Sequence, residues 1–182
     1  MKLRFIFLLL AFISSFSYGC NNDGIKDLVE TDHGKVIQIF NSERIAPGSS
    51  IFFYYLNADD EHPDLKASYA PDRCNPKLST IFDSFSYDGD VAHIESVFWG
   101  EGKYRKNLFI IVSWVYNLDN VNTVGKYYNV FAYDYNTKNV AKNDKLTSLF
   151  ESGQDGFVDG KAVKYKFKTA GNIWSYLRAQ QQ

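Results

Sequence analysis

The stretch LFIIVSWVY, residues 108–116, decides the fold. Its apolar side chains occupy both alternating sets of strand positions, so neither face of such a strand suits water. Its β-branched and aromatic residues also favour a strand over a helix. We therefore expect a central strand that the rest of the protein covers on both sides.

Other strand-like segments flank this one at hairpin spacing, namely residues 78–87, 90–99 and 125–135. Asp88 and Gly89 join the first two segments, and an Asp-Gly pair favours the positive φ angles of a two-residue hairpin turn. The sequence therefore predicts that residues 78–87 pair with residues 90–99.

Earlier in the chain, residues 36–40 and 51–56 predict another hairpin around the turn at residues 46–49. Residues 57–77 hold three of the four prolines and many charges, without an apolar period. This composition predicts a long loop, and long loops often carry function.

The C-terminal part of the chain completes the predicted fold. Residues 142–150 predict a short helix, and residues 163–168 predict a last strand with a basic, solvated face. Thr169 can cap a final helix whose apolar face includes Ile173 and Leu177. The predicted fold class is α+β, a mainly antiparallel β-meander sheet with a C-terminal helix packed on it.

The N-terminus has the pattern of an export signal. Lys2 and Arg4 precede an apolar run at residues 5–13, and small or polar residues follow up to Gly19. The apolar run is shorter than the roughly 20 residues of a membrane-spanning helix, which argues against the alternative of a retained membrane anchor. The pattern predicts an exported protein of the periplasm or the cell envelope.

The predicted domain organisation follows from this signal. It comprises a signal peptide at 1–19, an N-terminal tail or linker at 20–34 and a single β-rich domain at 35–182. The polar, Gly- and Asp-containing sequence of residues 21–34 indicates the linker.

The two cysteines allow two interpretations. Cys20 either pairs with Cys74 in a disulfide, or is acylated and tethers a bacterial lipoprotein to a membrane. Gly19 suits a lipoprotein signal, whereas Ser17 stands where such signals usually have Leu. Both interpretations stay open.

The charge of the chain argues against nucleic acid as a partner. Without Lys2 and Arg4 the exported chain has 18 basic and 21 acidic side chains, and the basic ones are scattered. A domain that binds a phosphate backbone usually has a clustered basic face.

The sequence also lacks the common templates for chemistry. The three histidines, His33, His62 and His93, have no zinc-helix spacing, and no Gly-x-Ser-x-Gly elbow or phosphate-binding glycine loop occurs. The acidic clusters at 59–64 and 155–160 do not have the spacing of a calcium loop and are more typical of solvated loops and Asp-Gly turns. We therefore expect no catalytic residue, no metal site and no cofactor.

The sequence contains IESVFW at 94–99 with the polar turn at 100–106, LFIIVSW at 108–114, Gly156-Phe157 with Asp159-Gly160, Lys168-Thr169-Ala170 and Leu177. Together these segments resemble small exported bacterial immunity proteins. The resemblance implies a periplasmic protein that blocks a toxin delivered by a neighbouring cell, commonly through type VI secretion. It carries no catalytic signature.

We therefore predict a non-catalytic protein that binds a toxin or hydrolase. Exposed aromatic and arginine side chains often dominate such interfaces, and acidic loops attract basic partners. The candidate partner-binding residues are Tyr54, Tyr55, Asp59, Asp60, Glu61, Tyr104 and Arg105. The alternatives are an envelope lipoprotein with a structural or carbohydrate-binding role and a small envelope hydrolase.

Overall fold

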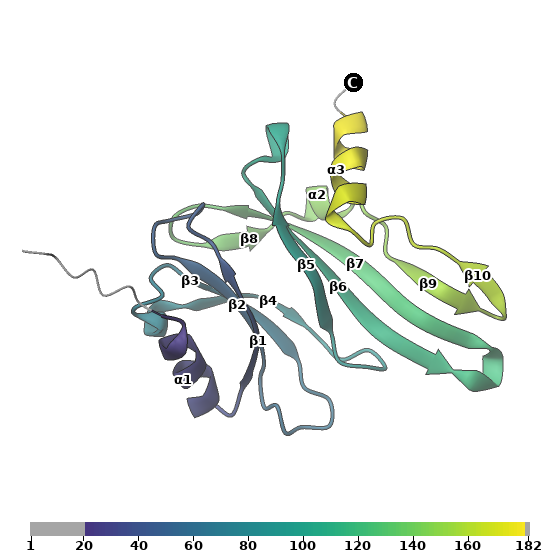
Figure 1. The fold of residues 1–182 in the computed structure, drawn as a ribbon, viewed down its shortest axis with the longest axis horizontal. Helices are drawn as coiled ribbons and strands as arrows, with labels where there is room; N and C mark the ends of the chain where they lie inside the picture. Colours follow the sequence, from purple (N-terminus) through teal and green to yellow (C-terminus); the bar gives the residue numbers. More distant parts are fainter. Residues whose placement is uncertain (1–20, 181–182) are drawn as a thin grey trace, which may run out of the picture.

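The computed structural model describes residues 21–180. Two antiparallel sheets pack face to face, and each has a helix on its outer face (Figure 1). The predicted α+β class, with mainly antiparallel strands and a C-terminal helix, is confirmed. The predicted signal peptide and Cys20 lie outside the described residues. Among residues 21–180, no helix is long and apolar enough to cross a membrane.

The first sheet, sheet A, is a meander in which each strand pairs with the next. Its strands are β1 (Lys35–Asn41), β2 (Ser50–Tyr55), β3 (Leu65–Ala70) and β4 (Thr80–Phe85). The predicted hairpin of β1 and β2 is confirmed. The prediction of a loop throughout 57–77 is wrong, because β3 lies within it and the 3-10 helix η1 (Pro76–Leu78) follows.

The second sheet, sheet B, has the strand order β10-β9-β7-β6-β5, and β8 pairs with the end of β7. Its strands are β5 (His93–Trp99), β6 (Asn107–Leu118), β7 (Thr123–Tyr135), β8 (Val140–Lys142), β9 (Gly153–Val158) and β10 (Lys161–Val163). The predicted pairing of 78–87 with 90–99 is wrong, because β4 and β5 belong to different sheets. Gly89 has the expected positive φ of 76°, but this turn lies in a crossover between the sheets.

The central-strand prediction is confirmed for residues 107–114 of β6, all of which are buried. On one face, Leu108 and Ile110 meet Ile51 and Phe53 of sheet A in the core between the sheets. On the other face, Phe109 belongs to a second core that the C-terminal helix covers. The last four residues of β6 leave both cores and are largely exposed.

Helix α1 (Asp23–Thr31) lies where the sequence predicted a linker, so that prediction is wrong for these residues. Ile25 and Val29, one helical turn apart, are buried against Phe52 and Ala70 on the outer face of sheet A. Burial of these two side chains stabilises a helix that its polar sequence alone does not specify.

The C-terminal helix α3 (Ala170–Ala179) has the predicted cap and apolar face. The Thr169 Oγ1 atom accepts a hydrogen bond from the Asn172 amide, and Ile173 and Leu177 are buried. Within the predicted helix at 142–150, only one turn forms, α2 (Asp144–Thr147).

The segment between β9 and α3 differs from its prediction. The last strand ends at Val163, and Tyr165 and Phe167 leave the sheet to enter the second core. Of the two expected Asp-Gly turns, only Asp159-Gly160 forms one, with φ angles of 50° and 73°. The other Asp-Gly pair, at 155–156, lies inside β9.

Candidate protein-binding surface

Two loops lie side by side at one end of sheet A. Residues 56–64 join β2 to β3, and residues 86–92 lead from β4 to β5. The loops leave from adjacent strands, and the rings of His62 and Tyr87 bring them together with a centroid distance of 4.0 Å. We call this surface the acidic end and define it by Asp59, Asp60, Glu61, Asp64, Asp88 and Asp90.

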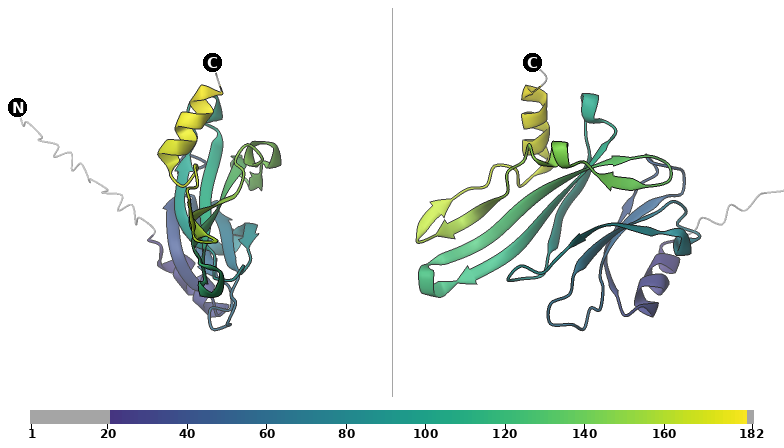
Figure 2. Two further views of the ribbon diagram at one scale, coloured as in Figure 1. Left: turned by 90° about the vertical axis from the view of Figure 1, so that its right-hand side faces the viewer. Right: turned by 180° about the vertical axis from the view of Figure 1, so that it is seen from behind.

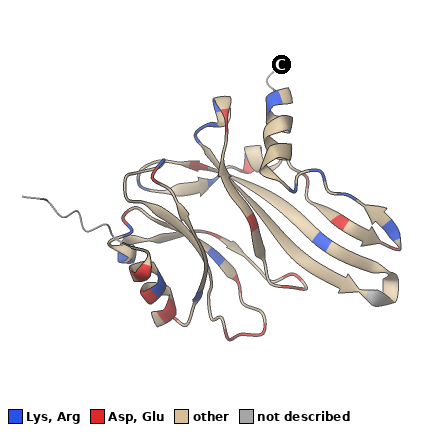
Figure 3. Ribbon diagram, in the orientation of Figure 1, with Lys and Arg blue, Asp and Glu red and all other residues tan. Residues whose placement is uncertain are grey.

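Most of the carboxylates at the acidic end have no cation beside them. Asp64 pairs with Lys66 at 3.0 Å, and Asp90 contacts the His93 Nε2 atom at 3.2 Å. The other four, Asp59, Asp60, Glu61 and Asp88, are exposed and form no ion pair with any described residue. Acidic residues mark both loops in Figure 3. The acidic end therefore carries uncompensated negative charge.

Charge is distributed unevenly along the chain, and the acidic end lies in the more acidic range. Residues 21–92 contain 13 acidic and 6 basic side chains, whereas residues 93–180 contain 8 acidic and 12 basic ones. The first range contains all of sheet A and the second all of sheet B. An asymmetry of this kind orients a charged partner before contact.

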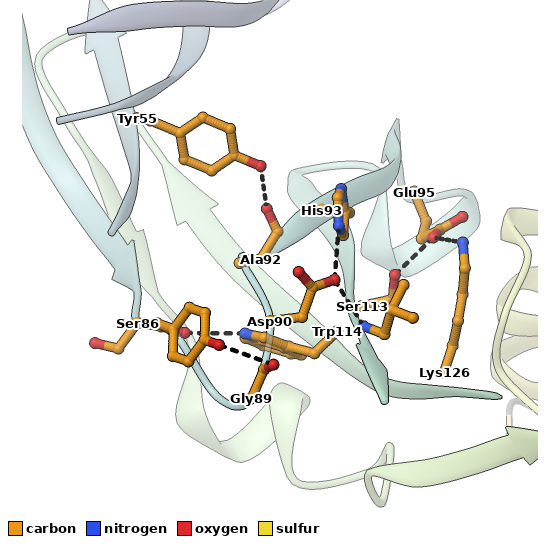
Figure 4. A network of polar contacts seen from close by, with 12 residues as sticks. Tyr55, Ser86, Gly89, Asp90, Ala92, His93, Glu95, Ser113, Trp114 and Lys126 are labelled. Carbon is orange, nitrogen blue, oxygen red and sulfur yellow. Dashed lines mark hydrogen bonds and ion pairs between the residues drawn. The ribbon is translucent and has the colours of Figure 1, made fainter. Parts of the chain in front are cut away.

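The crossover at 86–92 is held by aromatic side chains from both sheets (Figure 4). From β6, the Trp114 indole Nε1–H donates to the Ser86 carbonyl at 2.9 Å. From β2, the Tyr55 hydroxyl donates to the Ala92 carbonyl, also at 2.9 Å. Burial, followed by the nearby charge of Asp90, raises the pKa of the Tyr55 hydroxyl above its ordinary value, so it stays protonated as a donor.

Asp90 connects the crossover to sheet B. Its Oδ2 atom accepts a hydrogen bond from the Val115 amide at 3.3 Å and lies near the His93 ring (Figure 4). Val115 lies two residues beyond Ser113, the last β6 residue that pairs with β5. One carboxylate thus fixes the end of the loop to the start of the free part of β6.

A β-bulge in β5 places a further carboxylate that sequence reasoning did not identify. The register between β5 and β6 shifts between Ile94 and Ser96, and the Glu95 carboxylate accepts hydrogen bonds from Ser113 Oγ and Lys126 Nζ, both at 2.6 Å. Burial opposes ionisation of Glu95, but these hydrogen bonds outweigh it and lower the pKa of the carboxyl. No feature of the sequence predicts this bulge.

The candidate residues from the sequence do not form one surface. Asp59, Asp60 and Glu61 lie at the acidic end, next to Asp88 and Asp90 from the crossover. Asp88 and Asp90 are visible in the sequence as acidic residues around the Asp-Gly turn, but that turn predicts a local hairpin and not a position beside residues 59–61.

The four remaining candidates lie elsewhere. Tyr54 packs against Phe52 on the outer face of sheet A, while Tyr55 points into the network described above. Tyr104 and Arg105 lie at or beside the 3-10 helix η2 (Gly102–Tyr104) in the β5–β6 connection, at the opposite end of β5 from the crossover. Tyr104 is half-buried against the second core and Arg105 is exposed.

The proposed cysteine chemistry stays a prediction. Cys74 is exposed in the connection between β3 and η1, and Cys20 is outside the described residues. Within residues 21–180, no group of three or more His, Cys, Asp or Glu side chains is arranged to hold a metal ion.

Comparison with known proteins gives no matching family model, no similar curated protein and no matching solved structure. The case for a function therefore depends on the surface itself.

Proposed function

We propose that this chain is an exported, non-catalytic protein of the cell envelope that binds and neutralises a basic toxin or hydrolase, as an immunity protein does. The observation that carries the proposal is the acidic end, where four exposed carboxylates lack cations among the described residues and face solvent together. A complementary basic surface would supply the missing counter-charges.

The hydrogen bonds behind the acidic end favour a binding role. Loops that are already fixed lose little conformational entropy when a partner binds, which leaves more of the contact energy as affinity. Here the Trp114 and Tyr55 side chains hold the crossover, and the His62–Tyr87 ring contact joins it to the neighbouring loop.

The direct test is binding to the purified product of a toxin-type gene that lies beside the gene for this chain. We expect Asp59→Asn/Asp60→Asn/Glu61→Gln to weaken binding about tenfold or more, since close charge pairs at interfaces contribute about 1.5 kcal/mol or more in total. The matched control removes the same number of exposed, unpaired carboxylates elsewhere, as Asp27→Asn/Glu30→Gln/Glu151→Gln. Equal affinities of the two triple variants would contradict the proposal.

The compartment has its own test. Mass spectrometry of the protein from its native host should find a chain that begins at Cys20, either acylated or disulfide-linked to Cys74. A chain that retains Met1 in the cytosol would rule out export and the neutralisation of a toxin in the envelope.

One cavity keeps carbohydrate binding as a second candidate function. About 400 Å³ of space lies beside the crossover, lined by Phe85, Tyr87, Trp114 and Phe131 together with polar residues that include Asp83 and Asn129. Aromatic rings with a few polar groups are typical of small-molecule sites. Titration with soluble peptidoglycan fragments should quench tryptophan fluorescence under this alternative, and Trp114→Phe should reduce that change.

A further inference from the structure

The far end of sheet B projects from the body as an uncovered arm. We define the β arm as residues 115–125 of β6, the 3-10 helix η3 (Asp119–Val121) and β7, together with residues 156–163 of β9 and β10. Figures 1 and 2 show these strands extending beyond both sheet A and helix α3. Neither core of sheet B includes a residue of the arm.

The arm carries most of the exposed apolar side chains. Nine large hydrophobic residues are exposed among residues 21–180, and five of them are on the arm: Val115, Leu118, Val121, Val124 and Phe157. Val124 and Phe157 are direct cross-strand partners, so their side chains lie on one face. Val115 shares this face, whereas Leu118 pairs with Thr123 and lies on the opposite face. Exposed apolar side chains grouped in this way mark interaction sites in soluble proteins.

Hydrogen bonds between its two turns hold the tip of the arm together. The Gly160 amide donates to the Asn122 carbonyl at 2.9 Å, and the Asp159 amide donates to Thr123 Oγ1 at 3.0 Å. These two bonds join the β9–β10 turn to the β6–β7 turn. The apolar side chains are therefore presented on a fixed strand surface.

The first residue of the arm lies beside the acidic end. The Asp90 carboxylate accepts the hydrogen bond of the Val115 amide, which places the last acidic residue of the crossover beside the first exposed apolar residue of the arm. The nearest cation on this part of β7, Lys126, is engaged by Glu95. An apolar centre beside a charged rim is the usual anatomy of a protein–protein interface.

We propose that the β arm is the apolar part of the same interface, and that the partner presents an apolar patch bordered by Lys and Arg side chains. The proposal rests on the proposed function and specifies the chemistry of the partner surface. Uncompensated carboxylates at the acidic end fit the basic border, and the exposed apolar side chains on both faces of the arm fit the apolar patch.

Site-specific photo-cross-linking in the native host tests the geometry. A benzophenone amino acid is placed at Leu118 on the arm, at Asp60 on the acidic end and at Arg105 at the opposite end of β5. We expect Leu118 and Asp60 to cross-link to the same basic protein and Arg105 not to do so. Cross-links from Leu118 only to a second copy of this chain would overturn the proposed occupant.

Affinity for that cross-linked protein, once purified, provides the quantitative test. Leu118→Ser should weaken binding about tenfold or more, as truncation of an interface hot spot does. Ile81→Ser on the edge of sheet A is the matched control, because both side chains are 56% exposed in strands, and it should leave affinity unchanged. Thermal melting verifies that both variants are folded.

The outcomes separate the two proposals. A partner that cross-links from Asp60 but not from Leu118, with unchanged affinity in Leu118→Ser, would overturn the role of the arm alone. No partner from either position would overturn the proposed function as well.

Discussion

At the scale of single residues, two glycines allow the β arm to form. Gly125 in β7 and Gly156 in β9 are cross-strand partners, with φ angles of 153° and 145°. A Cβ atom on either would collide with the backbone carbonyl of the facing strand, at Asp155 or Val124. Only glycine satisfies both the backbone angle and the close approach.

Gly125→Ala should therefore destabilise the protein by about 1–3 kcal/mol, measured by denaturant unfolding. Gly24→Ala, inside helix α1, is the matched control. The added Cβ would lie 3.6 Å from the Pro76 side chain, which is an ordinary contact distance. Alanine favours the helix, so the control should be neutral or slightly stabilising. Equal destabilisation by both substitutions would contradict the close approach seen between β7 and β9.

The buried tyrosines make stability depend on pH in the alkaline range. Burial, with a further contribution from Tyr127, raises the pKa of Tyr165 to about 12. Because this pKa lies above the unfolded value of about 10, the unfolded chain loses the proton first, and stability falls as the pH rises from about 10 to 12.

Tyr165→Phe should reduce this loss, measured as the change in denaturant midpoint between pH 9 and pH 11. The variant also loses the hydrogen bond from the Tyr165 hydroxyl to the Glu151 carbonyl, which lowers its stability at every pH. An unchanged slope with pH would show that Tyr165 does not titrate in this range.

At the scale of elements, the sequence predicts where strands lie better than it predicts which strands pair with each other. The apolar run of β6 and the cap of α3 depend on local residue types, and both predictions were correct. The pairing of β4 with β5 failed because turn chemistry at Asp88-Gly89 specifies a backbone shape and not the sheet to which the next strand belongs.

Two missed elements had weak signals. In β3, the alternation of Leu65, Ala67 and Tyr69 indicates a strand, but neighbouring prolines and charges dominated the interpretation. In α1, three apolar residues in nine, of which only Ile25 and Val29 are buried, give little reason to expect a helix, since its stability comes from contact with sheet A. The carboxylates of the acidic end were visible in the sequence, while their proximity depended on the crossover between sheets.

Helix α1 should contribute measurably to the stability of the domain. Ile25 is fully buried, so Ile25→Ala should cost about 2–5 kcal/mol in the free energy of unfolding. Lys26→Ala, at the neighbouring exposed position, should change it by less than about 0.5 kcal/mol. A similar small effect for both would indicate that the helix does not pack on sheet A in solution.

At the scale of the whole molecule, two sheets form the body. The acidic and apolar parts of the proposed interface lie on different sheets. The loops of the acidic end leave from strands of sheet A, while the arm is the far end of sheet B. The crossover at 86–92 is what brings them together. This arrangement explains why the surface cannot be recognised within a single stretch of sequence.

The charge asymmetry predicts how binding responds to salt. Association with a basic partner should slow steeply as the ionic strength rises from about 0.01 M to 0.15 M, since screening shortens the range of attraction from about 30 Å to 8 Å. Stopped-flow kinetics can measure this dependence. The Asp59→Asn/Asp60→Asn/Glu61→Gln variant should show a shallower dependence than the parent, and parallel curves would contradict steering by the acidic end.

Hydrogen–deuterium exchange of the complex with the purified partner tests the combined surface most directly. Binding should slow exchange in residues 57–64, 86–92 and 115–124, and leave residues 100–106 at the η2 turn unchanged. Protection confined to 100–106, or none in the loops and the arm, would contradict the account.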